Sequence, residues 1–253
     1  MKGGPGMAQA KRTALITGAG RNIGRACALA LARDGFNVVV NGSSNRAACD
    51  TVAAEVRDLG VEALVAMGDV GVSAEAKRVA AEAIARFGAV DVLVNNAAIR
   101  PNKPFLEIDE GEWQRVMAVD LDAAVVLARA CLPGMLAKGW GRIINFAGMN
   151  AIHGHAGRPH VSVAKHGAWG LAKALAVEFG PKGITANIVS PGPIQGERDD
   201  PATAKRIAAT VAAVPVGRMG TPDEVAAAVR LLASDAGGFI NGQMIQVNGG
   251  AAT

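Results

Sequence analysis

A glycine-rich turn near the start of the chain constrains the fold more than any other feature. Residues 13–17 form a short aliphatic run, Gly18, Gly20 and Gly24 follow it, and an Ala/Leu-rich segment continues behind them. This order predicts a strand, a tight turn and a helix. The first N–H groups of such a helix and its dipole face outward above the strand, where they favour an anion such as a diphosphate.

The turn alone leaves two interpretations open. The spacing from Gly18 to Gly24 is longer than the G-x-G-x-x-G fingerprint. A plain connection between a strand and a helix can also use glycines. The rest of the chain therefore has to decide whether the turn binds a nucleotide.

Aliphatic runs that alternate with helical segments follow along the whole chain. Strands are predicted at 13–16, 37–41, 62–67, 90–94, 142–146, 185–189 and 243–247. This alternation predicts a parallel sheet with helices on both faces. We therefore predict an α/β fold, a single-domain Rossmann-type doubly wound parallel sheet over residues 12–253, preceded by a flexible leader at 1–11.

Several helix boundaries can be predicted. Ser73 is a candidate cap, and Thr221 to Glu224 form a capping box with proline at the first helical position. A long helix is expected from about 109 to 138, interrupted or ended near Pro133 and Gly134, and another from about 160 to 179. Residues 195–214 are expected to form a mobile helical lid over the carboxyl edge of the sheet.

Composition argues against several classes of function. The net charge is +4, but lysines and arginines are scattered among acids, without the basic stripe or aromatic platforms that nucleic-acid binding needs. No apolar run is long enough to cross a bilayer, so no membrane partner is expected. Cys27, Cys49 and Cys131 are far apart, as in proteins of a reducing compartment, and we expect a cytoplasmic location.

Five stretches, of which the glycine turn is the first, have a recognisable order and spacing. They are Thr17–Gly24, Gly68–Val70, Asn95–Ala98, Ser190–Gly192 and Val247–Gly250. With them the chain resembles the short-chain dehydrogenase/reductase family over almost its whole length, and within it the branch that is similar to 3-oxoacyl carrier-protein reductases. The resemblance implies a small-molecule substrate and a homotetramer that packs through the long helix, the helix of Lys165 and the last strand. Ala168, Ala172 and Ala176 would permit close helix approach.

The resemblance also implies a dinucleotide site at the carboxyl ends of the strands, which is where open α/β sheets bind ligands. The diphosphate and the adenosine ribose would lie against Gly18, Arg21, Ile23 and Gly24. The adenine would lie against Asp69 and Val70, the ribose side against Asn96 and Ala97, and the nicotinamide against Pro191, Gly192 and Ile194, with Lys165 also at the cofactor.

The end of the second strand bears on the type of cofactor. A carboxylate there would accept from a ribose 2′-hydroxyl and repel a 2′-phosphate. This chain has Asn41, Gly42 and Ser43 instead, with Arg21 and Arg46 nearby. We therefore favour NADP(H) and keep NAD(H) as the alternative, in which both arginines are solvated surface groups.

The catalytic residues that the resemblance implies are mostly replaced. Lys165 is retained, but the chain has no tyrosine, and the tyrosine position holds Val161. Gly148 stands at the serine position and Asp120 at the asparagine position. Val161 cannot deliver the proton that carbonyl reduction requires, so the usual mechanism of the family is not available.

The loop before Lys165 offers substitutes. It contains Asn150, His153 and His160, and we prefer His155 and Arg158 as catalytic candidates, although both can also be ordinary exposed loop residues. Asp120 can form a buried ion pair with Lys165 or act as a base. The histidine spacing fits no familiar metal site, and no metal is expected.

Three functions remain open from the sequence. The first is an NADP(H)-dependent oxidoreductase that acts on a small carbonyl or alcohol with an atypical active site. The second is a lyase, isomerase or dehydratase on the same scaffold, in which Asp120, His155 and Lys165 perform acid–base chemistry. The third is a catalytically degenerate cofactor-binding protein.

Overall fold

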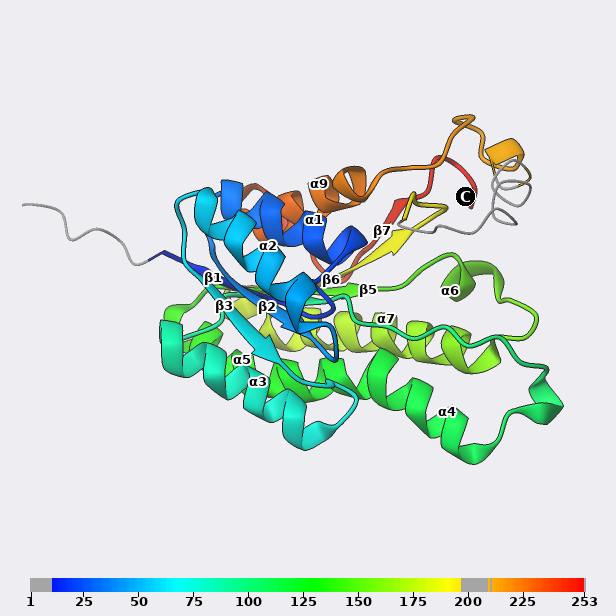
Figure 1. The fold of residues 1–253 in the computed structure, drawn as a ribbon, viewed down its shortest axis with the longest axis horizontal. Coiled ribbons are helices and arrows are strands. Elements are labelled where there is room, and N and C mark those ends of the chain that lie inside the picture. Colours follow the sequence, from blue (N-terminus) through cyan, green and yellow to red (C-terminus); the bar gives the residue numbers. More distant parts are fainter. Residues whose placement is uncertain (1–10, 197–208, 210, 253) are drawn as a thin grey trace, which may run out of the picture.

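A parallel seven-stranded sheet lies at the centre of the computed structural model, which describes residues 11–196, 209 and 211–252 (Figure 1). The strands occur in the order β3-β2-β1-β4-β5-β6-β7, and every neighbouring pair is parallel. Their bounds are β1 Thr13–Ile16, β2 Asn37–Gly42, β3 Ala63–Met67, β4 Val92–Asn95, β5 Gly141–Phe146, β6 Ile184–Pro191 and β7 Met244–Val247.

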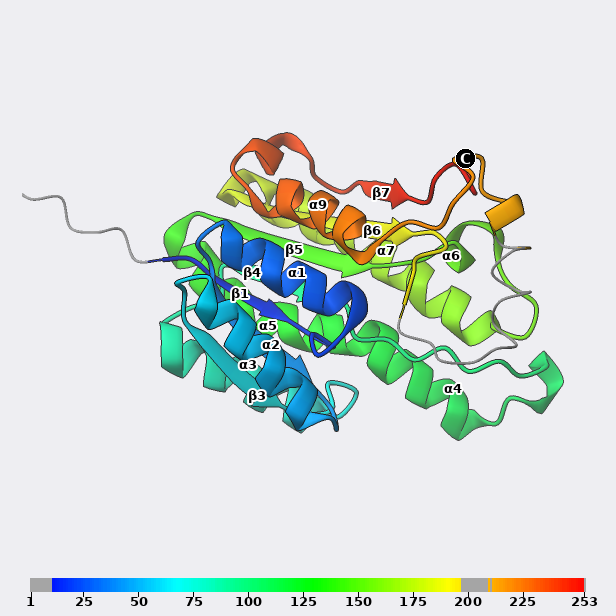
Figure 2. The same cartoon turned by 45° about the horizontal axis from the view of Figure 1, so that its top comes forward.

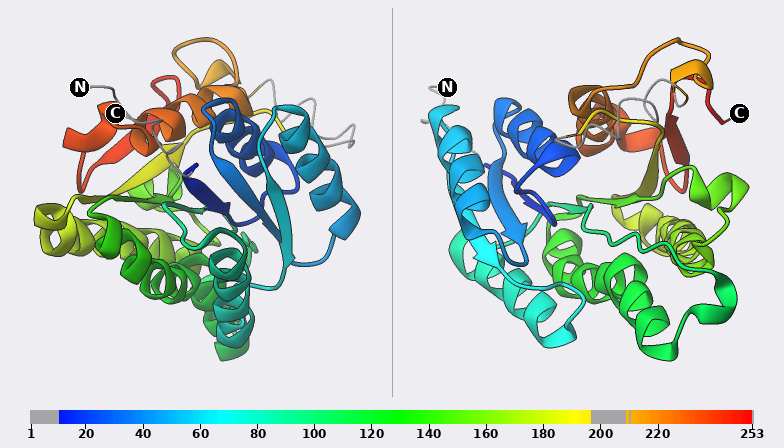
Figure 3. Two further views of the ribbon diagram at one scale, coloured as in Figure 1. Left: turned by 90° about the vertical axis from the view of Figure 1, so that its left-hand side faces the viewer. Right: turned by 45° about the vertical axis from the view of Figure 1, so that its right-hand side comes forward.

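Helices cover both faces of the sheet (Figures 1 and 3). One face carries α1 Asn22–Arg33, α2 Arg46–Asp58 and α9 Pro222–Ala233, and the other carries α3 Ser73–Phe87, α5 Ala123–Lys138 and α7 Pro159–Phe179. The helices α4 Glu110–Met117 and α6 Asn150–His153 lie beyond the carboxyl ends of the strands. Short 3-10 turns complete the described elements: η1 Phe105–Glu107, η3 Gly180–Lys182 and η4 Ala236–Phe239.

The core consists of two hydrophobic layers, one on each side of the sheet. Ile16, Val38 and Val40 face α1, α2 and α9, whereas Leu15 and Val39 face α3 and α5. Successive side chains of a strand point to opposite faces, and both faces are buried here, so the strands are aliphatic throughout rather than alternating. The predicted doubly wound α/β fold is confirmed.

The strand order places a crevice at one point of the carboxyl edge. β1 pairs with β2 on one side and with β4 on the other, so the chain changes direction across the sheet at β1 (Figure 2). Loops that leave β1 and β4 therefore diverge to opposite faces, and the gap between them is where ligands bind in open α/β sheets.

The long helix predicted for 109–138 is interrupted at a different place from the one expected. A π-helical segment, η2 Ala118–Asp122, separates α4 from α5, and Pro133 lies inside α5. A Cβ on Gly134 would lie 3.0 Å from the Cβ of Ala89, so this glycine allows close packing rather than ending the helix. The prediction of a break at 133–134 was wrong because tertiary packing outweighed local propensity.

Two smaller predictions are also corrected. Val72, not Ser73, occupies the N-cap position of α3, and Ser73 is the first helical residue. Ala168, Ala172 and Ala176 are buried within the chain itself, and α7 packs on β6. They are therefore not available as a contact surface between subunits. By contrast, Thr221 forms the predicted capping box at the start of α9.

Two predicted segments fall largely outside the described residues. Of the leader at 1–11, only Lys11 is described, and its Nζ donates to the carbonyl oxygen of Gly60 over 3.0 Å. Of the predicted lid at 195–214, residues 197–208 and 210 lie outside the described part of the chain. Among the helices that the structure describes, none combines the length and apolar character that crossing a membrane would require.

Candidate active site

The glycine turn after β1 is held by the side chain of Asn96, the residue that directly follows β4. Gly18 has φ +61°, and a Cβ on Gly24 would lie 2.2 Å from the carbonyl oxygen of Gly18. The amide of Asn96 donates to the carbonyl oxygens of Thr17 (2.9 Å) and Gly18 (3.1 Å). The turn therefore needs glycine at both positions, and Asn96 supports it from below rather than facing outward.

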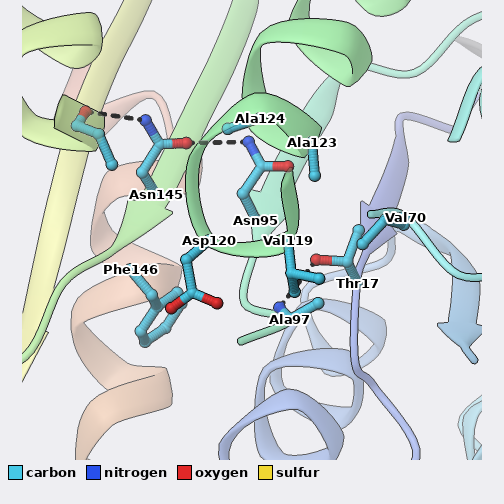
Figure 4. Close-up of a pocket in the computed structure, with 11 residues that line it drawn as sticks. Thr17, Val70, Asn95, Ala97, Val119, Asp120, Ala123, Ala124, Asn145 and Phe146 are labelled. Carbon is cyan, nitrogen blue, oxygen red and sulfur yellow. Dashed lines mark hydrogen bonds between the residues drawn. The ribbon is translucent and has the colours of Figure 1, made fainter. Parts of the chain in front are cut away.

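Thr17 joins the ends of β1 and β4, a role that the sequence analysis missed. Its Oγ1 accepts hydrogen bonds from the backbone N–H groups of Asn96 and Ala97, each 3.0 Å long. Figure 4 shows the bond to Ala97. A threonine directly after a buried aliphatic strand and directly before the first glycine was the available signal. These bonds close the floor of the crevice at the switch point.

The amino end of α1 suits a bound anion. Arg21 is its N-cap, in an extended conformation and exposed, and its side chain makes no capping hydrogen bond. The first turn of α1 contains no acidic residue, and Ile23 is partly buried against the core. The positive end of the helix dipole is thus not neutralised by a side-chain carboxylate of the first turn. The residues present fit the diphosphate of a dinucleotide.

The corner at the end of β2 is smaller and less polar than expected. Asn41 is buried, and its amide donates to the carbonyl oxygens of Ala66 (2.9 Å) and Gly68 (3.0 Å). This amide is therefore committed to the loop after β3 and is not a donor for a 2′-phosphate, contrary to the prediction for Asn41. Ser43 is exposed at the same corner.

Cys49 explains why glycine ends β2. A Cβ on Gly42 would lie 2.5 Å from the Sγ of Cys49, a buried residue of α2. Any larger residue at 42, including the aspartate or glutamate that would bind a ribose 2′-hydroxyl, needs Cys49 to move. Burial raises the pKa of the Cys49 thiol, so this cysteine is a packing residue.

Asp69 and Val70 lie at the end of β3, beside the crevice. The carboxylate of Asp69 accepts from Arg115 of α4 (2.6 Å) and from the backbone N–H of Gly71 (2.9 Å), so its orientation is fixed by the chain. Val70 is buried and lines a small cavity at the crevice floor. The two residues therefore form one wall of the site.

Pro191, Gly192 and Ile194 continue from β6 on the opposite side. A Cβ on Gly192 would lie 2.6 Å from the Cα of Asn248, so the two loops that follow β6 and β7 touch backbone to backbone. Ile194 is bridged to Gly220 and lines a cavity of about 160 Å³. This wall belongs to the same carboxyl edge as the glycine turn.

Lys165 and Asp120 meet inside the protein. The Lys165 Nζ lies 3.1 Å from the Asp120 Oδ2, and the two side chains are 3% and 0% exposed. Asp120 comes from the π-helical segment, and its Oδ1 accepts from the backbone N–H of Ile99 over 2.8 Å. The ion pair named as one alternative for Asp120 is therefore present in the structure.

Burial lowers the pKa of Lys165 below its ordinary value. The charge and hydrogen bond of Asp120 oppose this shift, and the nearby charge of Arg100 adds to it. Desolvation disfavours the ammonium form, and a carboxylate partner restores part of its stability. Lys165 is therefore easier to deprotonate than a solvent-exposed lysine.

A short chain of polar hydrogen bonds lies beside this pair at the centre of the sheet. Asn95 of β4 donates to the Oδ1 of Asn145 over 2.8 Å, and Asn145 donates to the carbonyl oxygen of Ala168 in α7 over 3.3 Å (Figure 4). Both asparagines line a cavity of about 10 Å³ together with Asp120 and Thr17. Asn145 is a polar residue within a buried aliphatic strand, a signal that the sequence analysis did not use.

Val161 and Gly148 differ in the space around them. Val161 is buried in a small apolar cluster with Val116 and Ala164. Gly148 has φ +149°, and a Cβ added there would meet no atom within 4 Å. The backbone at 148 disfavours any side chain, while the space beside it is open.

The loop histidines do not converge on one point. His153 and His155 are exposed, and the Nδ1 of His155 lies 2.5 Å from the carbonyl oxygen of Ala156. His160 is fully buried, with its Nε2 3.3 Å from the Oε1 of Glu112. Among the described residues, no three or more His, Cys, Asp or Glu side chains are grouped so that they could hold a metal ion. Arg158 is half-buried at the N-cap of α7.

Comparisons with known proteins agree with this architecture. Residues 18–252 match the family model described as enoyl-(acyl carrier protein) reductase. Nodulation protein G of Azospirillum brasilense is 37% identical over 95% of this chain and 98% of its own length. The 3-oxoacyl-[acyl-carrier-protein] reductase of Synechocystis is 37% identical over 94% of this chain and 96% of its own.

Two solved structures share the fold. A protein of Beutenbergia cavernae, assigned as an NAD(P)-dependent gluconate 5-dehydrogenase and holding NADP at low occupancy, has a TM-score of 0.88 and 38% identity. The alignment covers 96% of this chain and 98% of that one. A protein of Agrobacterium tumefaciens, assigned as a gluconate dehydrogenase, has a TM-score of 0.87 and 32% identity, with 95% of each chain covered.

The matched family model, the relatives that align over almost their full lengths and the doubly wound sheet with its glycine turn lead to one conclusion. This chain belongs to the short-chain dehydrogenase/reductase family and is similar to its 3-oxoacyl carrier-protein reductases.

Proposed function

We propose that this protein is an NADP(H)-dependent oxidoreductase that reduces a small carbonyl compound, with Lys165 as its proton donor. The observation that carries the proposal is the buried pair of Lys165 and Asp120 at the crevice. Two charges buried in a protein contribute little net stability, because desolvation offsets their attraction. Their presence beside a dinucleotide-type crevice is better explained by chemistry than by folding.

The proposed cofactor site combines both sides of the crevice. The backbone of the glycine turn at Gly18 and Gly24 and the amino end of α1, with Arg21 and Ile23, hold the diphosphate. Asp69 and Val70 border the adenine, and Ala97 borders the ribose above the turn that Asn96 supports. Pro191, Gly192 and Ile194 border the nicotinamide, close to Lys165.

NADP(H) is the proposed cofactor because the end of β2 offers a 2′-phosphate no carboxylate. Ser43 and Arg21 are exposed there, and Cys49 occupies the space that an acidic side chain at 42 would require. Arg46 lies 3.8 Å from Asp50, so its charge is partly balanced. The NADP bound to the similar structure from Beutenbergia cavernae supports the same choice.

NADPH, when bound in this crevice, would supply the hydride that a carbonyl carbon accepts. The carbonyl oxygen then needs one proton, and the Lys165 ammonium carries it at a lowered pKa, which favours its transfer. Asp120 orients the Lys165 ammonium and stabilises its charged form inside the protein. His155 is exposed and bonded to the neighbouring backbone, and an arginine such as Arg158 does not release its protons, so neither is proposed as the donor.

Oxidation of NADPH during turnover tests the proposal. The absorbance of the reduced nicotinamide is followed with a panel of carbonyl compounds at saturating NADPH. We expect turnover that Lys165→Met lowers by at least about 100-fold, since one positioned acid is worth that much. Lys173→Met is the matched control, because Lys173 is exposed on the same helix and packs on Trp169.

Other outcomes identify the two alternative functions. A product that forms without net NADPH oxidation, and that depends on Lys165, would indicate a lyase, isomerase or dehydratase. Tight NADPH binding without conversion of any tested compound would indicate a cofactor-binding protein without catalysis. Equal turnover in Lys165→Met and in the unchanged protein would contradict the role given to Lys165.

We also propose that the chain forms a homotetramer. Its subunits would pack through the outer surfaces of the interrupted long helix (α4 to α5), of α7 and of β7. Val163 and Val177 are apolar side chains of α7 that are 46% and 80% exposed, on the side away from the sheet. Light scattering on the purified protein tests this, and a monomer at micromolar concentration would contradict it.

A further inference from the structure

Two segments that carry cations but no acid meet beside the proposed active site. They are residues 99–104, which follow β4, and 153–158, which precede α7. The backbone N–H of Lys103 donates to the carbonyl oxygen of Gly157 over 2.8 Å. Gly157 has φ +79°, and a Cβ there would lie 2.4 Å from the Oδ1 of Asn102. The two segments therefore form one continuous wall.

This wall is a cationic rim, defined as Arg100, Lys103, His153, His155 and Arg158. The rim is not equally charged throughout. Lys103 is bound to Glu112 (3.0 Å) and Asp109 (3.3 Å), which balance it from α4 and its N-cap. Arg100 acts on Lys165 as a like charge. The rim therefore adds positive charge beside Lys165, whose own charge Asp120 already balances.

Arg158 has the buried polar group of this rim. Its Nε is covered by protein and finds no hydrogen-bond partner among the described residues, whereas Arg158 as a whole is only half-buried, so part of the residue is open to a ligand. Leaving a buried donor of a charged group unpaired is costly, so such a group is usually satisfied by a partner. The planar guanidinium presents paired N–H groups whose geometry matches a carboxylate.

The position of Arg158 relative to Lys165 limits the size of a ligand that reaches both. Arg158 precedes Lys165 by seven positions on the same helix, which corresponds to about 10 Å along the axis. Seven positions are close to two full helical turns, so both residues lie on the same side of the helix axis. Open space beside Gly148 adds room at this edge of the site. A molecule of a few carbon atoms can thus place a carbonyl near Lys165 and an acid near Arg158.

We infer that the substrate of the proposed reductase carries a carboxylate, which Arg158 binds while the carbonyl lies near Lys165. The inference rests on the proposed function and names its substrate class. A single guanidinium balances the single charge of a carboxylate, whereas a phosphate dianion would call for further unpaired donors. Arg158 is thereby a specificity-determining residue.

The test compares acids with their neutral counterparts. Oxo acids of four to six carbons, with the carbonyl at different positions, are assayed with NADPH beside their primary amides and beside phosphorylated ketones of similar size. We expect the unchanged protein to prefer an oxo acid over its amide. Arg158→Gln should lower that preference, as the ratio of kcat/KM values, about 10- to 100-fold and mainly through KM.

Two further variants separate charge from geometry. Arg158→Lys keeps the charge but loses the planar pair of N–H donors. We expect this variant to keep only part of the preference for oxo acids over amides. Arg33→Gln removes an exposed arginine at the far end of α1 and should leave the ratio unchanged. An unchanged ratio in Arg158→Gln, or a preference for amides or phosphorylated ketones in the unchanged protein, would overturn the inference.

A binding measurement separates failure of this inference from failure of the proposed function. Hydroxy acids of the same sizes are titrated, with NADP⁺ present, by calorimetry into the unchanged protein and into Arg158→Gln. Binding that is lost in the variant, without any turnover of oxo acids, would support the carboxylate site and contradict the reductase. Turnover of carbonyl compounds without selective binding of acids would support the reductase and contradict the carboxylate site.

Discussion

At the scale of single residues, the proposed active site depends on Lys165 and Asp120, which balance each other inside the protein. Neither side chain is more than 3% exposed, and their nearest charged atoms are 3.1 Å apart. A buried charge that loses its partner is strongly destabilising, typically by about 3–5 kcal/mol. Stability and chemistry are therefore coupled at this pair.

Asp120→Asn should make this coupling measurable. The pKa of Lys165 is already lowered by burial, and Asp120 is the main influence that raises it again, so removing the carboxylate lowers that pKa further. Where the pH lies between the folded and unfolded pKa values of a lysine, the unfolded chain binds more protons, and stability rises with pH. We expect a loss of about 3 kcal/mol at pH 6 and a smaller loss at pH 9, measured by urea unfolding.

The double variant Asp120→Asn with Lys165→Met is the control for this prediction. It removes both charges, so its free energy of unfolding at pH 6 should lie closer to that of the unchanged protein than the single variant does. A destabilisation by Asp120→Asn that is the same at both pH values would show that Lys165 is not the group responsible.

At the scale of elements, α9 is fixed by its first turn. The Thr221 side chain accepts from the backbone N–H of Glu224 over 3.2 Å, and the carboxylate of Glu224 accepts from the backbone N–H of Thr221 over 2.8 Å. Arg218 binds the same carboxylate and is the largest cause that lowers the pKa of Glu224 to about 2, followed by the Thr221 backbone. Because α9 packs on α1, this turn also supports the helix whose amino end borders the crevice.

Thr221→Ala should cost about 1 kcal/mol of unfolding free energy at pH 7, the usual value of a lost N-cap. The pKa of Glu224 is lowered on folding, so its contribution is present above about pH 4.5 and is lost as the pH falls toward 2. Urea unfolding at pH 7 and pH 3 measures both effects. Ser44→Ala, in an exposed loop, is the control, and an equal loss in it would contradict the capping argument.

At the scale of the whole molecule, a bound dinucleotide would contact loops that follow β1, β2, β3, β4 and β6. A ligand that binds only the folded chain stabilises it by an amount that grows with ligand concentration. The proposed cofactor should therefore protect the entire domain and not only the loops that it contacts.

NADPH at about 100 times its Kd should add about 2.7 kcal/mol to the stability. For a chain of this size that corresponds to a rise in Tm of roughly 5–10 °C, which differential scanning fluorimetry measures. Ser43→Asp places a like charge at the 2′-phosphate corner and should raise the Kd for NADPH at least about tenfold, with a smaller effect on NADH. Ala54→Asp, an exposed position of α2, controls for added charge. No shift with either nucleotide would contradict the cofactor site.

The order of strands and helices was predictable because it is encoded locally. Aliphatic runs such as Val38–Val40 and the capping box at Thr221 act over a few residues, and turns and caps repeat the same chemistry in many proteins. The glycine turn at Gly18 and Gly24 did not predict the crevice alone, and the five spaced stretches that resemble the short-chain dehydrogenase/reductase family were needed to place a site at the carboxyl ends of the strands. The sequence by itself therefore determined the fold and the edge of the sheet that carries the site.

The use of individual side chains at that edge was decided by contacts between distant segments. The amide of Asn41 donates to carbonyl oxygens at the end of β3 and in the loop after it, Cys49 fills the space above Gly42, and Arg158 is half-buried. The π-helical segment that aims Asp120 at Lys165 has no local signal of its own. Such features depend on packing across the sheet, which only the tertiary structure fixes, because a side chain finds its partner in space and not along the sequence.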